Sequence, residues 1–400
     1  MMLWLNRYIF VIHQQLMIVN LFNLISMKQF TLLAVLIFTS FVAPFTAQSC
    51  SAFLLKGKDY SVIGFNENWK TMPGMVVING RGVQKTGMSW KQLVSETQVP
   101  ERQAKWTSRY GSVSFNLLGV DMPCYGINEK GLFIVELYLA KTYSIADEKK
   151  ANLFWGHWIQ YQLDNFATVG EVVAHLNEAP VIDWWPTFPG SHFFLSDKKG
   201  NTAAVELIDG KYVISTGKTM PVPVLCNKPY QQELNTLSAY KAFGGEQEFD
   251  MTKAKLEWSE RYTKAAHYMK LYNAKADGDP IDYAWNALNN IGRGEWQLIY
   301  DVLHTNIQFR TDTGKEVKTI DMKAIDFSAK TPLFLDINAM LNGEVLSHFA
   351  PLTPSVNKEY VAKGFPIGYE NAEFANGEAF VTLQQNIDRY VRSTYFNTPQ

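Results

Sequence analysis

The stretch FVAPFTAQSCSAFLLKG (residues 41–57) joins an apolar segment to a predicted β-strand, and one cysteine, Cys50, lies at the junction. From Met27 the chain carries a lysine, a long apolar run and the tripeptide Ala47-Gln48-Ser49, which has the small-x-small pattern that signal peptidase accepts. We therefore predict a signal peptide over residues 1–49 and export to the periplasm or the medium. Its removal would make Cys50 the first residue of the folded protein.

Other interpretations of this N-terminal segment stay open. Residues 1–26 are also apolar, which a signal peptide does not need, so we expect translation to start at Met27 and the first 26 residues to be an upstream start extension. A membrane anchor is the alternative, because the run Phe30–Ala47 reaches the length of about 18 residues that a membrane span requires. Lipidation of Cys50 is disfavoured, because the residues before it lack the aliphatic position of a lipobox.

The charge and cysteine counts exclude several classes of protein. The sequence has 37 Lys and Arg residues against 38 Asp and Glu residues, and residues 1–49 hold two of the basic ones, Arg7 and Lys28, and no acidic one. A mature chain with a slightly acidic balance is not expected to bind nucleic acid. Cys50, Cys124 and Cys226 cannot form a disulfide framework and lack zinc-ligand spacing, so we expect no metal. The last two are interpreted as small buried apolar residues.

Strand patterns occur in consecutive runs that are separated by blocks of helix. The predicted strands before the first helical block are 51–56, 60–66, 74–83, 112–119 and 132–140, with a hairpin turn at Asn79-Gly80. Helical spacing covers 152–177, with a break near Ala167-Thr168, and then 257–274 and 283–291. The later strand patterns cover 192–197, 202–208, 211–216, 222–227, 295–311 and 318–327. Because single strands and helices do not alternate, the pattern favours an α+β fold with layered antiparallel sheets, in one domain over residues 50–400.

An N-terminal cysteine has unusual chemistry. A free α-amino group titrates near pH 7.7 to 8.0 and lies within reach of the sulfur of its own residue, so it can act as the general base that activates the thiol. Such a thiol would attack an amide carbonyl, form a thioester, release an amine and then be regenerated by water. Each tetrahedral oxyanion on this path needs hydrogen-bond donors that are already in place.

Five further motifs occur in the order found in one known family: VIGFNENW (62–69), GMVVINGRGV (74–83), GINEKGL (126–132), VLCNKPY (224–230) and WSERY (258–262). With Cys50-Ser51 ahead of them, the chain resembles the choloylglycine hydrolase family over roughly residues 50–320. That family comprises N-terminal nucleophile amide hydrolases, including bile salt hydrolases and penicillin V acylases. The resemblance implies a four-layer αββα sandwich, no metal or organic cofactor, and a homo-oligomer, specifically a tetramer.

The resemblance also assigns roles to individual residues. Cys50 matches the nucleophile and general base, and Asn227 matches an asparagine whose side-chain N–H groups help to form the oxyanion hole. Tyr138 falls where penicillin acylases tend to have tyrosine, and its contribution would come partly from its backbone N–H. Arg261 matches an arginine beside the nucleophile, where a fixed positive charge favours ionisation of the sulfur.

The motif VIGFNENW departs from the family pattern Gly-Arg-Asn-x-Asp-Trp at two positions. Phe65 replaces an arginine near the thiol, and Asn68 replaces the aspartate that holds the α-amino group. Asn68 can still accept a hydrogen bond from that amine, but it brings no negative charge. Glu67 is adjacent, yet alternation along a strand turns it to the face opposite Asn68, so we expect it not to replace Asn68 unless the backbone bulges.

These observations predict an exported cysteine amidohydrolase that cleaves a linear N-acyl amide, with the acyl part in an apolar, aromatic-lined pocket. Its partner would be a small-molecule substrate such as penicillin V, an N-acyl homoserine lactone, a conjugated bile acid or another acyl amino acid. Phe65 and Tyr138 disfavour bile salts. We expect no stable membrane association after leader cleavage. The alternative is a noncatalytic binding protein with the same fold, either membrane-anchored or secreted.

Overall fold

The structure is a computed structural model. It describes residues 50–69, 71–87, 103–117, 119–139, 151–177, 181–183, 190–252, 258–292, 294–369, 387–388 and 391. Residues 48–400 form one compact unit. The expected signal peptide and the alternative anchor Phe30–Ala47 lie outside the described residues. Within the described ranges, no helix combines the length and the apolarity that a membrane span needs.

The first of two large sheets, sheet A, contains the strand that follows Cys50. Its strand order is β14–β1–β2–β15–β16–β17–β19, antiparallel except at the short last pair. The bounds are Val224–Leu225 for β14, Ser51–Lys56 for β1, Ser61–Glu67 for β2, Trp296–Asp301 for β15, Asn306–Thr311 for β16, Lys318–Asp321 for β17 and Gly343–Glu344 for β19. β1 and β2 are buried on both faces, which is why they read as apolar runs and not as an alternation.

The second sheet, sheet B, is antiparallel throughout. Its order is β13–β12–β11–β8–β7–β6–β3–β18–β20. The bounds are Lys211–Thr216 for β13, Thr202–Ile208 for β12, Ser191–Ser196 for β11, Phe133–Tyr138 for β8, Pro123–Asn128 for β7, Ser112–Asn116 for β6, Met75–Asn79 for β3, Leu333–Asp336 for β18 and Ala350–Pro351 for β20.

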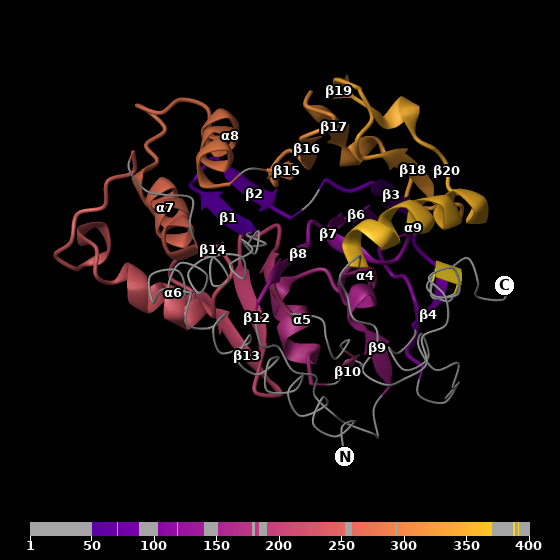
Figure 1. Ribbon diagram of the computed structural model, residues 1–400, viewed down its shortest axis with the longest axis horizontal. Coiled ribbons are helices and arrows are strands. Elements are labelled where there is room, and N and C mark those ends of the chain that lie inside the picture. Colours follow the sequence, from indigo (N-terminus) through magenta and orange to yellow (C-terminus); the bar gives the residue numbers. More distant parts are fainter. Residues whose placement is uncertain are drawn as a thin grey trace, which may run out of the picture. The chain divides into compact units, whose positions relative to one another are not determined.

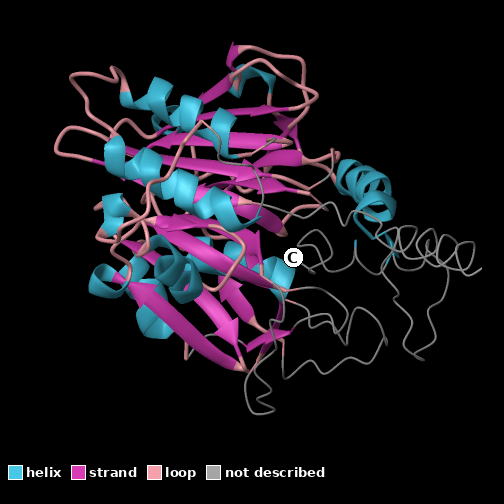
Figure 2. Cartoon of the chain, turned by 60° about the vertical axis from the view of Figure 1, so that its left-hand side comes forward, coloured by secondary structure: helices cyan, strands magenta, loops and turns pink. Residues whose placement is uncertain are grey.

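Helices cover the outer faces of the two sheets (Figures 1 and 2). α7 (Trp258–Leu271) and α8 (Pro280–Ile291) pack on β1, β2 and β15 of sheet A. α4 (Trp155–Asn165) packs on β7 and β8 of sheet B, and α5 (Val169–His175) follows it. The result is the expected α+β fold with four layers in the order helix, sheet, sheet, helix.

The remaining described elements are short or peripheral. They are α6 (Tyr230–Leu237), α9 (Pro354–Tyr369), the strand pairs β9 (Asn152–Phe154) with β10 (Val181–Asp183) and β4 (Gln84–Thr86) with β5 (Lys105–Thr107), and the 3₁₀ turns η2 (Gly217–Thr219), η3 (Lys241–Phe243), η4 (Met322–Ala324) and η5 (Leu346–His348).

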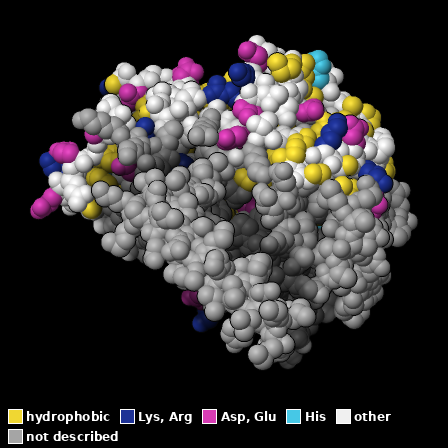
Figure 3. Space-filling view, viewed as in Figure 1, with side chains coloured by type: hydrophobic (Ala, Val, Ile, Leu, Met, Phe, Trp, Pro, Cys, Tyr) yellow, Lys and Arg dark blue, Asp and Glu magenta, His cyan; other side chains and the backbone are white. Residues whose placement is uncertain are grey.

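On the face shown in Figure 3, acidic and basic side chains of described residues are interspersed and are not separated by sign.

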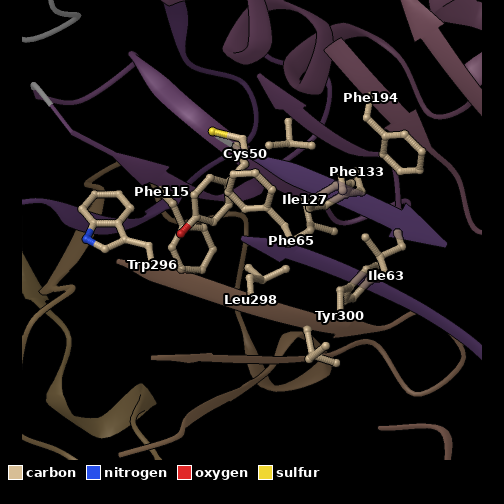
Figure 4. Close-up of a cluster of buried hydrophobic side chains, with 14 of the residues drawn as sticks. Cys50, Ile63, Phe65, Phe115, Ile127, Phe133, Phe194, Trp296, Leu298 and Tyr300 are labelled. Atoms are coloured by element: carbon tan, nitrogen blue, oxygen red, sulfur yellow. The ribbon is translucent and has the colours of Figure 1, made fainter. Parts of the chain in front are cut away.

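The main hydrophobic core lies between the two sheets. Figure 4 shows its centre, where Cys50 and Phe65 from sheet A meet Phe115, Phe133 and other side chains of sheet B. The Phe65 ring lies 4.8 Å from that of Tyr125, and Phe65 is fully buried. At the position where family members have an arginine near the thiol, this chain therefore has a core residue.

Most predicted elements are confirmed, and one turn is wrong. The predicted helical block 152–177 is wrong at its start, because Asn152–Phe154 form the strand β9 and α4 begins at Trp155. Its break is confirmed, because Thr168 is the N-cap of α5 and accepts a hydrogen bond from the backbone N–H of Glu171. Asn79-Gly80 does not close a hairpin. β3 ends at Asn79 and pairs instead with β6 and β18, while β4 pairs with β5. The helices α6 and α9 were not predicted.

Replacing Phe65 by alanine should lower the free energy of unfolding by about 3–5 kcal/mol, because it leaves a cavity between two sheets. Urea unfolding followed by circular dichroism measures this loss. The matched control is Met340→Ala, whose side chain is 79% exposed, and it should change stability by less than about 0.5 kcal/mol. A loss of under 1 kcal/mol for Phe65→Ala would contradict the placement of this ring in the core.

Candidate active site

Cys50 lies directly before β1 and is 7% exposed. Its side chain belongs to the main core cluster and lies at the edge of the part of that cluster shown in Figure 4. The backbone N–H groups of Asn68 and Tyr138 donate hydrogen bonds to the sulfur. Asn68 directly follows β2 of sheet A, and Tyr138 is the last residue of β8 of sheet B. The sulfur therefore lies beside the ends of two strands, one from each sheet.

The environment of the Cys50 sulfur contains charges of both signs. Burial raises the pKa of the thiol to about 12, and repulsion by the Glu67 carboxylate adds to this increase. The N–H of Asn68, the Arg261 guanidinium and the N–H of Tyr138 act in the opposite direction. In the full-length chain, where the nitrogen of Cys50 belongs to a peptide bond, the thiol is therefore neutral near pH 7.

Tyr138 and Asn227 lie together beside this sulfur. The Nδ2 group of Asn227 donates a hydrogen bond of 2.9 Å to the carbonyl oxygen of Tyr138. Asn227 is 5% exposed, and an amide NH₂ has two N–H groups, so this bond leaves one of them available. The backbone N–H of Tyr138 and the second N–H of Asn227 are thus two donors near the thiol. The phenol ring of Tyr138 is only partly buried.

Arg261 belongs to the first turn of α7 and is 5% exposed. Burial lowers the pKa of its guanidinium, and the neighbouring Cys226, Cys50 and Glu233 partly offset that decrease. The expected cation therefore lies close enough to the Cys50 sulfur to affect its ionisation. Cys226 is buried, and its thiol contacts the hydroxyl of Ser51 at 3.4 Å. Cys124 is only partly buried.

Asn68 is placed differently from the expectation. Its backbone N–H reaches the sulfur, but its side-chain Oδ1 accepts a hydrogen bond of 2.6 Å from the backbone N–H of Gly294. The loop between α8 and β15 approaches this side chain so closely that a Cβ on Gly292 would lie 2.5 Å from Asn68 Nδ2. The asparagine side chain therefore holds this loop.

Two buried residues near the site were not predicted from the sequence. Nε2 of His192, on β11, lies 2.6 Å from the carbonyl oxygen of Cys226, and its Nδ1 lies 2.9 Å from Oε1 of Glu206 on β12. The carboxylate of Glu206 also accepts a hydrogen bond of 3.0 Å from the backbone N–H of Tyr230. These contacts fix the backbone on both sides of Asn227, at Cys226 before it and at Tyr230 after it. The sequence feature that could have identified them is a histidine and a glutamate within otherwise apolar strand patterns.

Buried glutamates surround the site. Burial, reinforced by repulsion from Glu136 and Glu295, raises the pKa of Glu67 to about 8. Burial raises the pKa of Glu136 to about 7, although the Ser191 hydroxyl, which donates at 2.7 Å, lowers it. Burial also raises the pKa of Glu233, on α6, to about 7 against the attraction of Lys228 and Arg261. Among the described residues, no group of three or more His, Cys, Asp and Glu side chains is arranged to hold a metal ion.

Comparison with known proteins identifies the class. Residues 50–272 match the model of the linear amide C–N hydrolases, choloylglycine hydrolase family. Because the match covers more than half of the chain, the protein belongs to this family, and it is a hydrolase of linear amide C–N bonds.

Individual relatives agree with this assignment. The chain is 30% identical to a penicillin V acylase of Pectobacterium atrosepticum, over 62% of this chain and 78% of that one. The structure of a penicillin V acylase from Agrobacterium tumefaciens superimposes with a TM-score of 0.64 at 26% identity, over 76% of this chain and 98% of that one. A conjugated bile acid hydrolase from Clostridium perfringens has the same fold, with a TM-score of 0.57 at 18% identity over 72% and 97% of the two chains.

Replacing His192 by leucine should lower both stability and turnover. The change leaves the Cys226 carbonyl and the Glu206 carboxylate buried without this partner, which costs about 1–3 kcal/mol. The Asn227 donor loses its support, and kcat should fall at least about tenfold with KM little changed. Urea unfolding and hydrolysis of a chromogenic acyl amide measure the two effects. The control is His175→Leu, on the exposed surface of α5, which should change neither the stability nor kcat. An unchanged kcat in His192→Leu would contradict the proposed role of His192 in positioning Asn227.

The raised pKa of Glu233 predicts how stability depends on pH. The folded chain binds this proton up to about pH 7, whereas the unfolded chain releases it near pH 4.3. Between these two pKa values the folded state holds more protons than the unfolded state, so stability should fall as the pH rises from about 4 to 7. Glu233→Gln should weaken that fall and stabilise the protein at pH 8, as measured by urea midpoints. Glu248→Gln, whose side chain is 79% exposed, should leave the pH dependence unchanged; the same result for Glu233→Gln would show that this prediction is wrong.

Proposed function

We propose that the protein is an exported cysteine amidohydrolase that cleaves a linear N-acyl amide through a thioester on Cys50. The observation that carries the proposal is the environment of one sulfur, which receives two backbone N–H groups and lies near the Arg261 guanidinium. The sequence supports the export step, because a leader pattern ends at Ser49. Removal of that leader in the periplasm or during secretion would free the α-amino group of Cys50.

The arrangement supports a mechanism that begins only after processing. With the peptide bond to Ser49 intact, burial keeps the thiol protonated and no free amine can act as its base. Once that bond is hydrolysed, the neutral amine takes the thiol proton as the sulfur attacks the acyl carbonyl carbon. The backbone N–H of Tyr138 and the free N–H of Asn227 would stabilise the oxyanion. The proton then moves from the ammonium to the leaving nitrogen, the C–N bond breaks, and a thioester remains.

Water completes the cycle. The amine, again neutral, accepts a proton from a water molecule that attacks the thioester carbonyl, and the sulfur leaves as the acid is released. Arg261 favours the sulfur anion at both stages, because its guanidinium is a fixed positive charge. Thiol, amine and amide donors supply all of this chemistry.

The substrate class is proposed from the relatives. Two of them are penicillin V acylases, which supports an N-acyl amide with an apolar acyl part, such as penicillin V or an N-acyl homoserine lactone. A conjugated bile acid is the weaker candidate, because Phe65 replaces the arginine of the family pattern and Tyr138 stands where bile salt hydrolases have asparagine. The alternative of a noncatalytic binding protein is an outcome of the test below.

N-terminal mass spectrometry of the exported protein should show a chain that begins at Cys50. Cys50→Ser should reduce hydrolysis across a panel of chromogenic acyl amides by at least about 1,000-fold, because the nucleophile is lost. The control is Cys124→Ser, which changes another free cysteine and should keep most of the activity. A chain that retains its leader and still hydrolyses amides would overturn the mechanism. A correctly processed chain that binds acyl amides without turnover, unaffected by Cys50→Ser, would indicate a binding protein.

A further inference from the structure

Glu67 lies opposite Cys50 across the β1–β2 pair. The register pairs Ser51 with Asn66 and Ala52 with Phe65, without a bulge. Cys50 lies directly before the first paired residue, and continuing the register by one residue places Glu67 opposite it, in agreement with the effect of the Glu67 charge on the Cys50 thiol. Directly opposed residues of an antiparallel pair have Cα atoms about 4.5–5.5 Å apart, and their side chains lie on the same face. Glu67 and Asn68 thus act on different groups, as alternation along the strand predicts: Glu67 acts on Cys50, and the Asn68 side chain binds Gly294.

The Glu67 carboxylate is buried and only partly satisfied. The residue is 9% exposed, and its Oε2 atom has no hydrogen-bond partner among the described residues. Its charge acts directly on the thiol of Cys50. A buried carboxylate with an unused acceptor is costly unless a donor or a cation completes it. Glu67 thus has a free acceptor at the residue whose nitrogen would become an ammonium group after processing.

Asn68 is a poorer hydrogen-bond acceptor for the nitrogen of Cys50 than Glu67 is. Its side-chain acceptor, Oδ1, already accepts a hydrogen bond of 2.6 Å from the N–H of Gly294, which orients the amide toward that loop and leaves one lone pair. The residue also brings no charge to balance an ammonium. The side chain that stands at the position of the family's aspartate is therefore committed to the α8–β15 loop, and a carboxylate one residue earlier faces Cys50.

The other titratable groups that act on Glu67, or are acted on by it, are acidic. Glu136 from β8 and Glu295 from the segment before β15 repel it. Its own charge is felt by Cys124 and Tyr125 of β7. Together with burial, this repulsion raises the pKa of Glu67 to about 8. A cation placed at the nitrogen of Cys50 would lower that pKa, so that Glu67 is ionised while it holds the ammonium.

We propose that Glu67 is the positioning residue that holds the α-ammonium group of processed Cys50, in place of the aspartate that Asn68 has replaced. The inference rests on the proposed function, because it requires that Cys50 becomes the N-terminus. The carboxylate accepts a hydrogen bond from the ammonium and fixes the nitrogen beside the sulfur. As a negative charge it favours the protonated amine, so it also sets the pH at which the base becomes available.

The test uses the processed protein and two independent readouts. The first is the pKa of the α-amine, taken from the pH dependence of its carbamylation by cyanate and followed by peptide mass spectrometry. The second is the pH profile of kcat/KM on a chromogenic acyl amide. In Glu67→Gln, which keeps the size of the side chain, the amine pKa and the acidic limb of the profile should both move down by about one unit. kcat should fall about tenfold with KM little changed, because the amine is less well oriented.

Three further variants separate this role from a structural one. Glu67→Asp should restore most of the amine pKa, because the charge is kept. Glu136→Gln, which removes a carboxylate that repels Glu67, should leave the amine pKa within about 0.3 units. Asn68→Ala should also leave it unchanged. An unchanged amine pKa in Glu67→Gln, or a shift that appears in Asn68→Ala instead, would overturn the proposal.

The two readouts also keep the two proposals apart. If the processed wild type hydrolyses no amide in the panel, the proposed function fails, while carbamylation still reports whether Glu67 binds the amine. If the wild type is active and Glu67→Gln leaves both the amine pKa and the pH profile unchanged, the amidohydrolase stands and the role of Glu67 is refuted.

Discussion

The pairing of β1 with β2 is the interaction on which the candidate site depends. Cys50 directly precedes β1, its side chain belongs to the core between the two sheets, and the register of the pair, continued by one residue, places Glu67 opposite it. A slip of one residue would turn every side chain of β1 to the other face. Four of the six paired positions, from Ala52–Phe65 to Leu55–Val62, are apolar and buried, and their packing holds this register. The geometry around the sulfur is thus maintained by the core and not by contacts of the sulfur itself.

The site combines a buried thiol with an unusual number of acidic neighbours. Glu67 disfavours a sulfur anion, whereas Arg261 and two backbone N–H groups favour it. In the unprocessed chain burial dominates, and the thiol stays neutral. In the mechanism that we propose, cutting the chain before Cys50 changes this balance, because it adds a base beside the sulfur and a cation beside Glu67. The same cut would supply both, so activity and processing would be linked through one residue.

Prediction from sequence succeeded where a pattern is local. Strand and helix periodicity located most elements, and the short motifs around Cys50, Tyr138, Asn227 and Arg261 named four residues that the fold brings together. It failed at Asn79-Gly80, because β3 finds its partners far away in the chain. It also missed His192 and Glu206, whose contacts with each other and with Cys226 join neighbouring strands and a distant loop. A polar residue in an apolar strand signals burial but does not reveal its partner.

The sequence alone determined the layered α+β fold, the amide hydrolase family and the position of the candidate nucleophile, because these follow from periodicity and from short motifs. Only the tertiary structure decided which carboxylate faces Cys50. Strand register and the α8–β15 loop turn Asn68 toward Gly294 and leave Glu67 with an unused acceptor. The orientation of Asn68 depends on contact between segments more than 200 residues apart, and no local pattern of residues carries that information.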